Sequence, residues 1–291
     1  MKIIEPSFEI LEQKPGIDGI YKQIELAGRT CYKSENKITA DSAKGFVERM
    51  ISNKHYAMLE HGTVYLKMFV NNPKVKNYET NKYSQVNTPL DRFSYITTNL
   101  RVIVENCWMD DLDFLCDPTE YHDKRATVLF HTQIAITREF NRHRVNSMAE
   151  SSTRYCNYSK DKFGNELSVN LPEWVDTVCI DDLSGRFKTM CQIISDGYEE
   201  EDMDAIDWWY FGNLAAEMAY MNLIRLGKKP QEARVILPLD TNTDLVHTAF
   251  VSDWKHFFDL RAHGTTGAPH PDAKALALPL YEEFLKRGYI R

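Results

Sequence analysis

A short basic segment carries the densest chemistry in the chain. Four arginines and one histidine lie within 17 residues of a protein whose net charge is −7. These cations are Arg138, Arg142, His143, Arg144 and Arg154. Guanidinium groups match phosphate geometry and bind it through paired hydrogen bonds. The hydroxyls of Ser151, Ser152 and Thr153 add further polar groups. The segment therefore indicates an anion site, most simply one for phosphate.

The same residues also have a structural interpretation. Ser147 and Glu150 have the spacing of a helix capping box. Glu150 and Arg154 stand four residues apart, as in an ion pair on one helix face. Arg138 and Arg142 would then line a solvated helix surface. Residue types alone leave both interpretations open, a phosphate site or an exposed helix.

Composition limits the classes of protein to consider. The 291 residues are 43% hydrophobic and 26% charged, as in soluble globular proteins. No apolar run approaches the ~20 residues of a membrane span, and the first residues lack the apolar core of a signal peptide. A net charge of −7 disfavours non-specific binding of nucleic acid. We therefore expect no membrane partner and no nucleic-acid partner.

Cysteine and histidine usage predicts a cytoplasmic protein without a metal site. The six cysteines form no C-x-x-C pair, and we expect reduced thiols. His263 and His270 flank a Gly-Thr-Thr-Gly loop, but no acid or cysteine cluster stands at ligand spacing. The common glycine-rich nucleotide motifs, the G-x-S-x-G motif and the H-E-x-x-H motif are also missing.

Hydrophobic periodicity predicts the elements that position the basic segment. Helices are expected at 42–54, 124–141, 183–195, 207–226, 230–236 and 248–260, with a last one after Pro271, kinked near Pro279. Strands are expected at 63–70, 93–96 and 101–104, with a turn at 97–99 and connections at 74–92, 110–123 and 156–172. Strands and helices do not alternate regularly, which favours an α+β fold.

The order of residues in the basic segment resembles the signature of the flavin-dependent thymidylate synthases. That signature, R-H-R-x-x-S-x-x-E-x-S-x-R-Y, is matched by Arg142, His143, Arg144, Ser147, Glu150, Ser152, Arg154 and Tyr155. Other family-like segments follow in order: a small-Arg-x-Cys-aromatic turn at 27–32, Glu-His at 60–61, A-R-x-x-L-P at 233–238 and Leu-Arg at 260–261. The resemblance covers about 20–70, 127–155 and 215–285, with insertions near 72–125 and 157–205.

The resemblance implies a fold, a reaction and an assembly. The fold would be α+β, a small and mostly antiparallel sheet with flanking helices, in one domain over residues 1–291. The reaction would be methylation of dUMP to dTMP, with methylenetetrahydrofolate as carbon donor and tetrahydrofolate as product. Reduced FAD, recharged by NADPH, would donate the hydride. The enzyme would be a homotetramer whose active sites lie between subunits.

The resemblance also assigns site residues by position. The nucleotide would contact Glu139, Arg142, Glu150, Ser151, Ser152, Thr153, Arg154, Arg234 and Arg261. FAD would contact His61, Thr63, Arg142, His143, Arg144, Glu150, Phe250 and His256. Arg261 would be catalytic, because a fixed cation lowers the cost of negative charge in the uracil ring. Ser152 would bind rather than attack, because no base with an orienting partner is evident.

Three positions depart from the family pattern, and two other functions remain alternatives. Glu139 stands where many members have Gln, and its carboxylate would repel an anion unless paired, for example with Arg138 or Arg142. Ala149 replaces a polar residue, and Phe250 an Asn. A nucleotide- or RNA-binding protein would use the arginines without chemistry. A flavoprotein reductase would bind FAD but act on another substrate.

Overall fold

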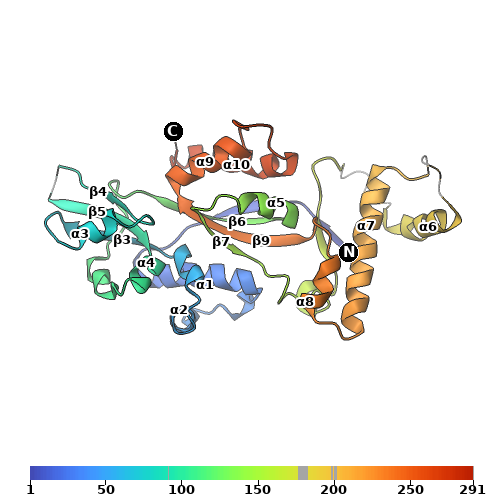
Figure 1. The fold of residues 1–291 in the computed structure, drawn as a ribbon, viewed down its shortest axis with the longest axis horizontal. Coiled ribbons are helices and arrows are strands. Elements are labelled where there is room, and N and C mark those ends of the chain that lie inside the picture. Colours follow the sequence, from blue (N-terminus) through green and yellow to red (C-terminus); the bar gives the residue numbers. More distant parts are fainter. Residues whose placement is uncertain (91, 176–182, 198, 200–201, 291) are drawn as a thin grey trace.

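A four-stranded antiparallel sheet forms the centre of the protein. The computed structural model describes residues 1–90, 92–175, 183–197, 199 and 202–290. The strands lie in the order β2 (Ser7–Leu11), β6 (Arg125–Gln133), β9 (Asn242–Phe250) and β7 (Ser147–Glu150). Helices α9 (Val251–Arg261) and α10 (Pro271–Lys286) cover one face of the sheet, and α1 (Gly16–Tyr32) covers the other (Figure 1).

Alternating side chains give this sheet a core on each face. Leu245 of β9 packs with Phe130, Phe140, Trp254 and Phe257 in the cluster beneath α9 and α10. The next residue, Val246, packs instead with Ala27 of α1 and Ala149 of β7. Successive residues of a strand point to opposite faces, so both faces of β9 are buried. The strand that runs beside the signature segment is therefore fixed from both sides.

A second sheet forms a lobe at one end of the molecule (Figure 1). Its order is β3 (Thr63–Phe69), β5 (Phe93–Asn99) and β4 (Gln85–Asn87). The short helices within residues 35–140 are α2 (Ser42–Ser52), α3 (Val75–Glu79), α4 (Leu100–Glu105), α5 (Ile134–Phe140) and the 3-10 helices η1 (Glu35–Lys37), η2 (Tyr56–His61) and η3 (Met109–Phe114). Of these, α3, α4 and η3 pack against the second sheet, whereas α5 packs against the central sheet.

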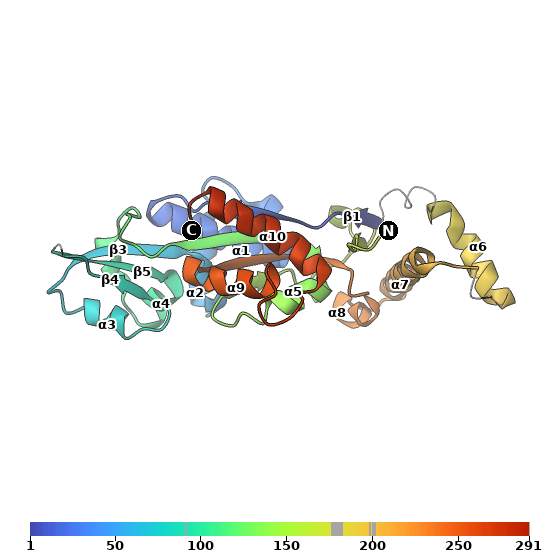
Figure 2. The same ribbon diagram turned by 90° about the horizontal axis from the view of Figure 1, so that it is seen from above.

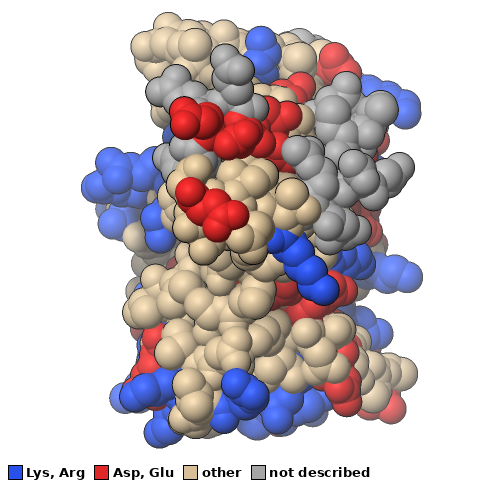
Figure 3. Space-filling view, turned by 90° about the vertical axis from the view of Figure 1, so that its right-hand side faces the viewer, with Lys and Arg blue, Asp and Glu red and all other residues tan. Residues whose placement is uncertain are grey.

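The opposite end consists mainly of helices (Figure 2). Here β1 (Lys2–Ile4) pairs in parallel with β8 (Ser168–Asn170). The helices are α6 (Leu183–Asp196), α7 (Ala205–Arg225), α8 (Pro230–Ala233), η4 (Asp161–Phe163) and η6 (Arg234–Ile236). Viewed end-on, the middle of this surface is largely uncharged (Figure 3).

Much of the predicted secondary structure is confirmed. The α+β class is correct, and the strand at 63–70 and the helices at 42–54, 183–195, 207–226 and 230–236 appear with small shifts of their ends. Helix α7 begins with a capping box between Asp204 and Asp207 and is followed by Gly227 at φ 90°. The single small sheet that we expected is instead three separate sheets. Among the described residues, no helix is long and apolar enough to cross a bilayer.

Two helix predictions were wrong around the central sheet. Residues 124–141 form β6 followed by the short helix α5, because Ala126, Val128 and Phe130 alternate into the core and β6 pairs with strands on both sides. The predicted helix from 248 begins only at Val251, since 248–250 end β9. The supposed capping box at Ser147 is also strand, namely β7. In each case long-range pairing overrides local propensity.

Other predictions failed in the lobe and near the N-terminus. The predicted turn at 97–99 continues β5, and 101–104 is helix α4, which Asn99 caps by accepting from the Val102 amide at 3.2 Å. The predicted connections at 74–92 and 110–123 contain α3, β4 and η3. The family-like turn at 27–32 is the end of α1, which was not predicted, nor were β1 and β2.

Gly62 offers a test of how tightly η2 and β3 pack against α1. A Cβ at Gly62 would lie 2.6 Å from Ile24 Cδ1 and 2.8 Å from Ile20 Cγ2. Gly62→Ala should therefore lower the free energy of unfolding by about 1–3 kcal/mol. Gly212→Ala is the matched control, because its Cβ meets nothing within 4 Å and alanine favours a helix by about 0.5–1 kcal/mol. The measurement is urea unfolding of both variants. A Gly62→Ala protein with the same free energy of unfolding as the control would contradict this tight packing.

Candidate active site

The signature segment runs from the end of α5, through a loop, along β7 and into a second loop. Phe140 anchors the end of α5 in the core, and β7 pairs with residues 245–248 of β9. Arg142, His143 and Arg144 therefore lie before β7, and residues 151–153 lie after it. A cavity lies at each end of this short strand. The alternative interpretation of the segment as one exposed helix is thus wrong beyond Arg138, which does lie on the exposed face of α5.

The cavity after β7, which we call the serine cavity, has a volume of about 560 Å³. It is lined by Ile134, Arg138, Glu150, Ser151, Ser152, Thr153, Arg234, Val235, Leu237, Pro238 and Leu239. Arg234 Nη1 donates to Thr153 Oγ1 at 3.2 Å, which joins two segments far apart in sequence. Neither Arg138 nor Arg234 has a carboxylate partner among the described residues. The cavity therefore presents two cations without an ion-pair partner beside hydroxyls, together with the Glu150 carboxylate at its edge, an arrangement that suits an anion near the two arginines.

Backbone hydrogen bonds hold the loop 151–153 against α1 and β9. The Ser151 amide donates to the Asp244 carbonyl at 2.8 Å, and the Ser152 amide donates to the Cys31 carbonyl at 3.0 Å. The Ser151 hydroxyl donates to the Thr30 carbonyl at 3.0 Å. The Ser152 hydroxyl accepts only a long bond of 3.4 Å from the Arg154 amide. Ser151 thus helps to fix the loop, while the Ser152 hydroxyl has no further hydrogen bond among the described residues.

Glu150 and Arg154 do not form the ion pair that a helix would have given. Glu150 accepts from Thr137 Oγ1 at 2.7 Å and from Asn141 Nδ2 at 2.9 Å, which orients its carboxylate toward α5. Arg154 does not line the serine cavity, and its guanidinium lies 5.5 Å from the centre of the Tyr155 ring. Within one chain, Arg154 is therefore apart from the other predicted nucleotide residues.

Before β7 lie two adjoining hollows, which together we call the arginine cavity. One, of about 350 Å³, is lined by Arg142, His143, Arg144, Val145, Asn146, Asp253, His256, Leu260 and Arg261. The other, of about 670 Å³, is lined by Glu60, Lys82, Tyr83, Gln85, Asn99, Arg101, Val102, Glu105, Arg125, Arg144, Val145, Asn146, Ser147, Ala249, Phe250 and Asp253. The second hollow is thus lined in part by residues 82–105 of the lobe, which we set apart as an insertion in the sequence.

Arg261 is held by Glu139. Its Nη1 donates to Glu139 Oε2 at 2.6 Å and its Nη2 donates to the Glu139 carbonyl at 2.8 Å. The expected partners of Glu139 were Arg138 and Arg142, so Arg261 at the end of α9 is the correct one. Glu139 does not line the serine cavity. Its carboxylate instead fixes the guanidinium of Arg261 at the edge of the arginine cavity.

Buried histidines beside this cavity are neutral. Burial lowers the pKa of His61 to about 3, and its Nδ1 lies 2.8 Å from Thr248 Oγ1. Burial, reinforced by the charge of Arg261, lowers the pKa of His143 to about 4. Nε2 of each ring is buried without a partner among the described residues. The ring of His143 lies 5.7 Å from that of His256. Neutral imidazoles can accept or donate a hydrogen bond without adding charge.

Arg125 is a site residue that the sequence did not reveal. Its Nη1 donates to the Glu60 carbonyl at 3.1 Å and to Thr63 Oγ1 at 3.2 Å, and its guanidinium lies 5.5 Å from the centre of the Phe250 ring. Burial lowers its pKa to about 10, so it stays charged at neutral pH. Arg125 thereby links Thr63 and Phe250, two predicted flavin residues. The sequence feature that could have revealed Arg125 was its place at the start of an apolar run, but we interpreted that run as a helix.

The predicted residues thus fall into two groups. Glu150, Ser151, Ser152, Thr153 and Arg234 line the serine cavity. Arg142, His143, Arg144, Phe250, His256 and Arg261 line the arginine cavity. Glu139 and Thr63 hydrogen-bond to residues that line the arginine cavity without lining it themselves, and His61 bonds Thr248, which lines neither cavity. None of the described residues lines both cavities.

The sequence match agrees with this arrangement. A model of the thymidylate synthase complementing protein family matches residues 123–287, which include both signature loops, Arg234 and Arg261. The chain therefore belongs to the thymidylate synthase complementing protein family. A search among curated proteins found no match.

Solved structures offer only distant likenesses. Crystal structures of a UMP/dUMP methylase, PolB from Streptomyces cacaoi, bound with 5-Br dUMP or 5-Br UMP, are 15% and 14% identical to this chain, each with a TM-score of 0.43. The matches cover 98% of this chain and 93% and 92% of those chains. The family assignment rests on the sequence match.

Proposed function

We propose that this protein is a flavin-dependent thymidylate synthase. The reaction is methylation of dUMP to dTMP with methylenetetrahydrofolate, and FAD recharged by NADPH is the redox cofactor. The observation that carries the proposal is the division of the signature by β7. Its hydroxyls share one cavity with Arg234, and its R-H-R residues share the other with Arg261. Membership of the family supports the same reaction.

The serine cavity is the proposed site of the nucleotide phosphate. Arg234 and Arg138 have no carboxylate partner among the described residues, so their charge is available to a ligand. Ser152 and Thr153 supply hydroxyls next to them. Charge-assisted hydrogen bonds of this kind are about twice as strong as neutral ones. Glu150, held by Thr137 and Asn141, forms the edge toward α5 and serves as an acceptor for the nucleoside.

The arginine cavity fits a flavin dinucleotide. Arg142 and Arg144 have no carboxylate partner among the described residues and suit a pyrophosphate. His61 and His143 hold buried, unpartnered Nε2 atoms that suit hydrogen bonds to a ring system. His61, Thr63, Arg142, His143, Arg144, Phe250 and His256 would hold the cofactor. Glu150, which lines the serine cavity, would contact it where the two cavities meet between subunits. When bound, FAD would supply the hydride that completes the methyl group.

Arg261 is the proposed catalytic residue. Its guanidinium would lie against the uracil ring and favour the N3-deprotonated form, which makes C5 more nucleophilic. Glu139 presents the guanidinium in one orientation through two contacts, so that little reorganisation is needed at the moment of reaction. The Glu139 carboxylate thus acts on the nucleotide through Arg261, which accounts for an acid at this position.

We also propose that complete sites form between subunits of a homotetramer. Val145 of the arginine cavity is 69% exposed, and Val235 and Leu239 of the serine cavity are 82% and 51% exposed. Exposed apolar side chains around a polar site are typical of surfaces that bind another chain. Residues 1–291 would then act as one cytoplasmic catalytic domain, whose insertion 72–125 contributes one wall of the arginine cavity.

Release of tritium from C5-labelled dUMP tests the reaction directly. With methylenetetrahydrofolate, NADPH and FAD present, we expect release that stops when FAD is omitted. No release from folded, flavin-loaded protein would overturn the proposal and favour a reductase with another substrate. No release and no bound flavin would favour a nucleotide- or RNA-binding protein.

A further inference from the structure

Lys33 joins α1 to the central sheet at the back of the serine cavity. It follows the last residue of α1 in a left-handed conformation, with φ 48°. Its Nζ forms an ion pair with the Asp244 carboxylate on β9, and His131 Nδ1 binds the other carboxylate oxygen at 2.8 Å. The Asp244 side chain is almost completely buried. The pair therefore connects two elements separated by 211 residues in sequence.

The same two elements carry the loop 151–153. Asp244 accepts from the Ser151 amide through its backbone carbonyl, while Thr30 and Cys31 at the end of α1 accept from Ser151 Oγ and the Ser152 amide. The spacing between α1 and β9 thus sets the position of the loop. Lys33 adds a charged link between them, next to the apolar packing of Ala27 and Cys31 against Val246.

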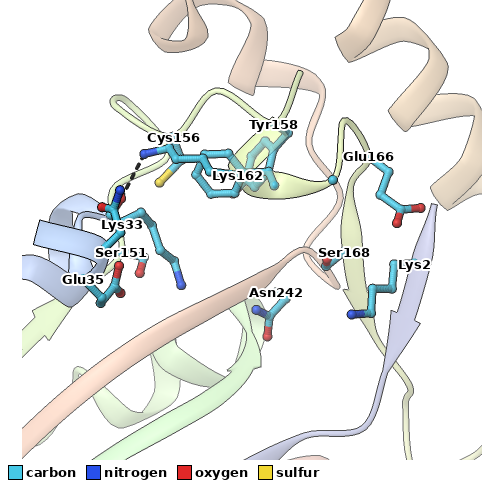
Figure 4. Close-up of a pocket in the computed structure, with 13 residues that line it drawn as sticks. Lys2, Lys33, Glu35, Ser151, Cys156, Tyr158, Lys162, Glu166, Ser168 and Asn242 are labelled. Atoms are coloured by element: carbon cyan, nitrogen blue, oxygen red, sulfur yellow. Dashed lines mark hydrogen bonds between the residues drawn. The ribbon is translucent and has the colours of Figure 1, made fainter. Parts of the chain in front are cut away.

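A segment of the predicted insertion supports Lys33 from the other side. Lys162 Nζ donates to the Lys33 carbonyl at 2.9 Å, shown as a dashed line in Figure 4. Lys33, Ser151 and Lys162 line a separate hollow of about 500 Å³, into which Asn242 of β9 also faces. This hollow borders the serine cavity, since Ser151 lines both.

We propose that Lys33 is a positioning residue that holds the loop 151–153 in the geometry needed to bind the nucleotide phosphate. The inference rests on the proposed function, because it assigns the loop to dUMP. Burial would raise the pKa of Asp244, but the hydrogen bond from His131 and the charge of Lys33 hold it below its ordinary value. Asp244 therefore stays ionised, and without Lys33 its buried charge would keep only His131.

The test compares Lys33→Met with Lys33→Arg and with Lys37→Met, an exposed lysine of η1. Lys33→Met should raise the KM for dUMP by about tenfold to a hundredfold, because small displacements of positioning groups have effects of that size. NADPH oxidation without dUMP should stay unchanged. Lys33→Arg should restore most of the affinity, and Lys37→Met should match the wild type. Should Lys33→Met not fold, Lys33→Gln takes its place.

A second comparison locates the effect in the loop. In a Ser152→Ala background, Lys33→Met should add less to the KM for dUMP than it does alone, since both changes act on one loop. If Lys33→Met left the KM for dUMP unchanged, or reduced dUMP turnover and NADPH oxidation equally, the proposed role of Lys33 would be overturned. The proposed function of the protein would still stand. A wild-type protein that neither binds nor turns over dUMP would overturn the proposed function as well.

Discussion

Arg261→Ala is expected to reduce kcat for dTMP formation by about 10²–10³-fold while the protein stays folded. Arg261 is fixed by two contacts to Glu139, at 2.6 Å and 2.8 Å, and lines the arginine cavity. A preorganised cation has its largest effect where negative charge develops during the reaction. The Glu139 side chain is 31% exposed, so water can solvate the carboxylate that the substitution leaves behind. The loss should therefore fall on turnover more than on stability.

The control is an arginine with similar contacts outside both cavities. Arg287 pairs with Glu283 at 2.7 Å and with Glu12 at 2.6 Å near the end of α10. Arg287→Ala removes an equal charge and comparable ion pairs, and its kcat should equal that of the wild type. Steady-state turnover and urea unfolding of both variants separate chemistry from stability. Turnover of Arg261→Ala within a few fold of the control would contradict the catalytic role.

Local sequence signals predicted the signature loops but not the element between them. The order of Arg142, Ser147, Glu150 and Ser152 carried the family resemblance without any knowledge of secondary structure. Yet Ser147 and Glu150 suited a helix cap equally well, and only pairing with β9 makes them a strand. Pairing partners lie about a hundred residues away, which a local pattern does not contain. The family resemblance was therefore predictable from local sequence, while the strand that separates the two loops was not.

Residues that act through long-range contacts were missed for a related reason. Arg125 reaches Glu60 and Thr63, and Lys33 reaches Asp244, only once the register of the sheets is fixed. In sequence, Arg125 and Lys33 resemble any surface cation. The wrong helix over 124–141 also hid the burial of Arg125. A correct prediction of β6 would have placed this arginine at the sheet end that faces Phe250.

The lobe 63–105 shows what an insertion can add to a site. Segment 72–125 was set apart because nothing in it resembled the family, and no role followed from its sequence. In the structure, Lys82, Tyr83, Gln85 and Arg101 form a wall opposite the R-H-R loop. Arg101 is paired with Glu60 at 2.5 Å and with Glu105 at 3.0 Å, which leaves Lys82, Arg125 and Arg144 as the lining cations without a carboxylate partner among the described residues. The larger hollow of the arginine cavity thus depends on this lobe.

Mixing two inactive variants should restore activity if the sites lie between subunits. Arg142→Ala damages only the arginine cavity, and Arg234→Ala damages only the serine cavity. Each homo-oligomer should be nearly inactive, because every site contains one damaged cavity. In a mixed oligomer, the serine cavity of an Arg142→Ala chain can meet the arginine cavity of an Arg234→Ala chain. That site is intact, and dTMP formation should rise well above either variant alone.

The matched control mixes two variants of the same cavity. Arg142→Ala and Arg261→Ala both damage the arginine cavity, so every shared site keeps a defect and no activity should return. Native mass spectrometry of both mixtures would establish that the subunits have exchanged. With exchange established, equal activity in the two mixtures would contradict sites built from a serine cavity and an arginine cavity of different chains. Rescue confined to the first mixture is expected only if each active site combines the serine cavity of one chain with the arginine cavity of another. If both cavities of a site came from the same chain, every site would keep the defect of that chain.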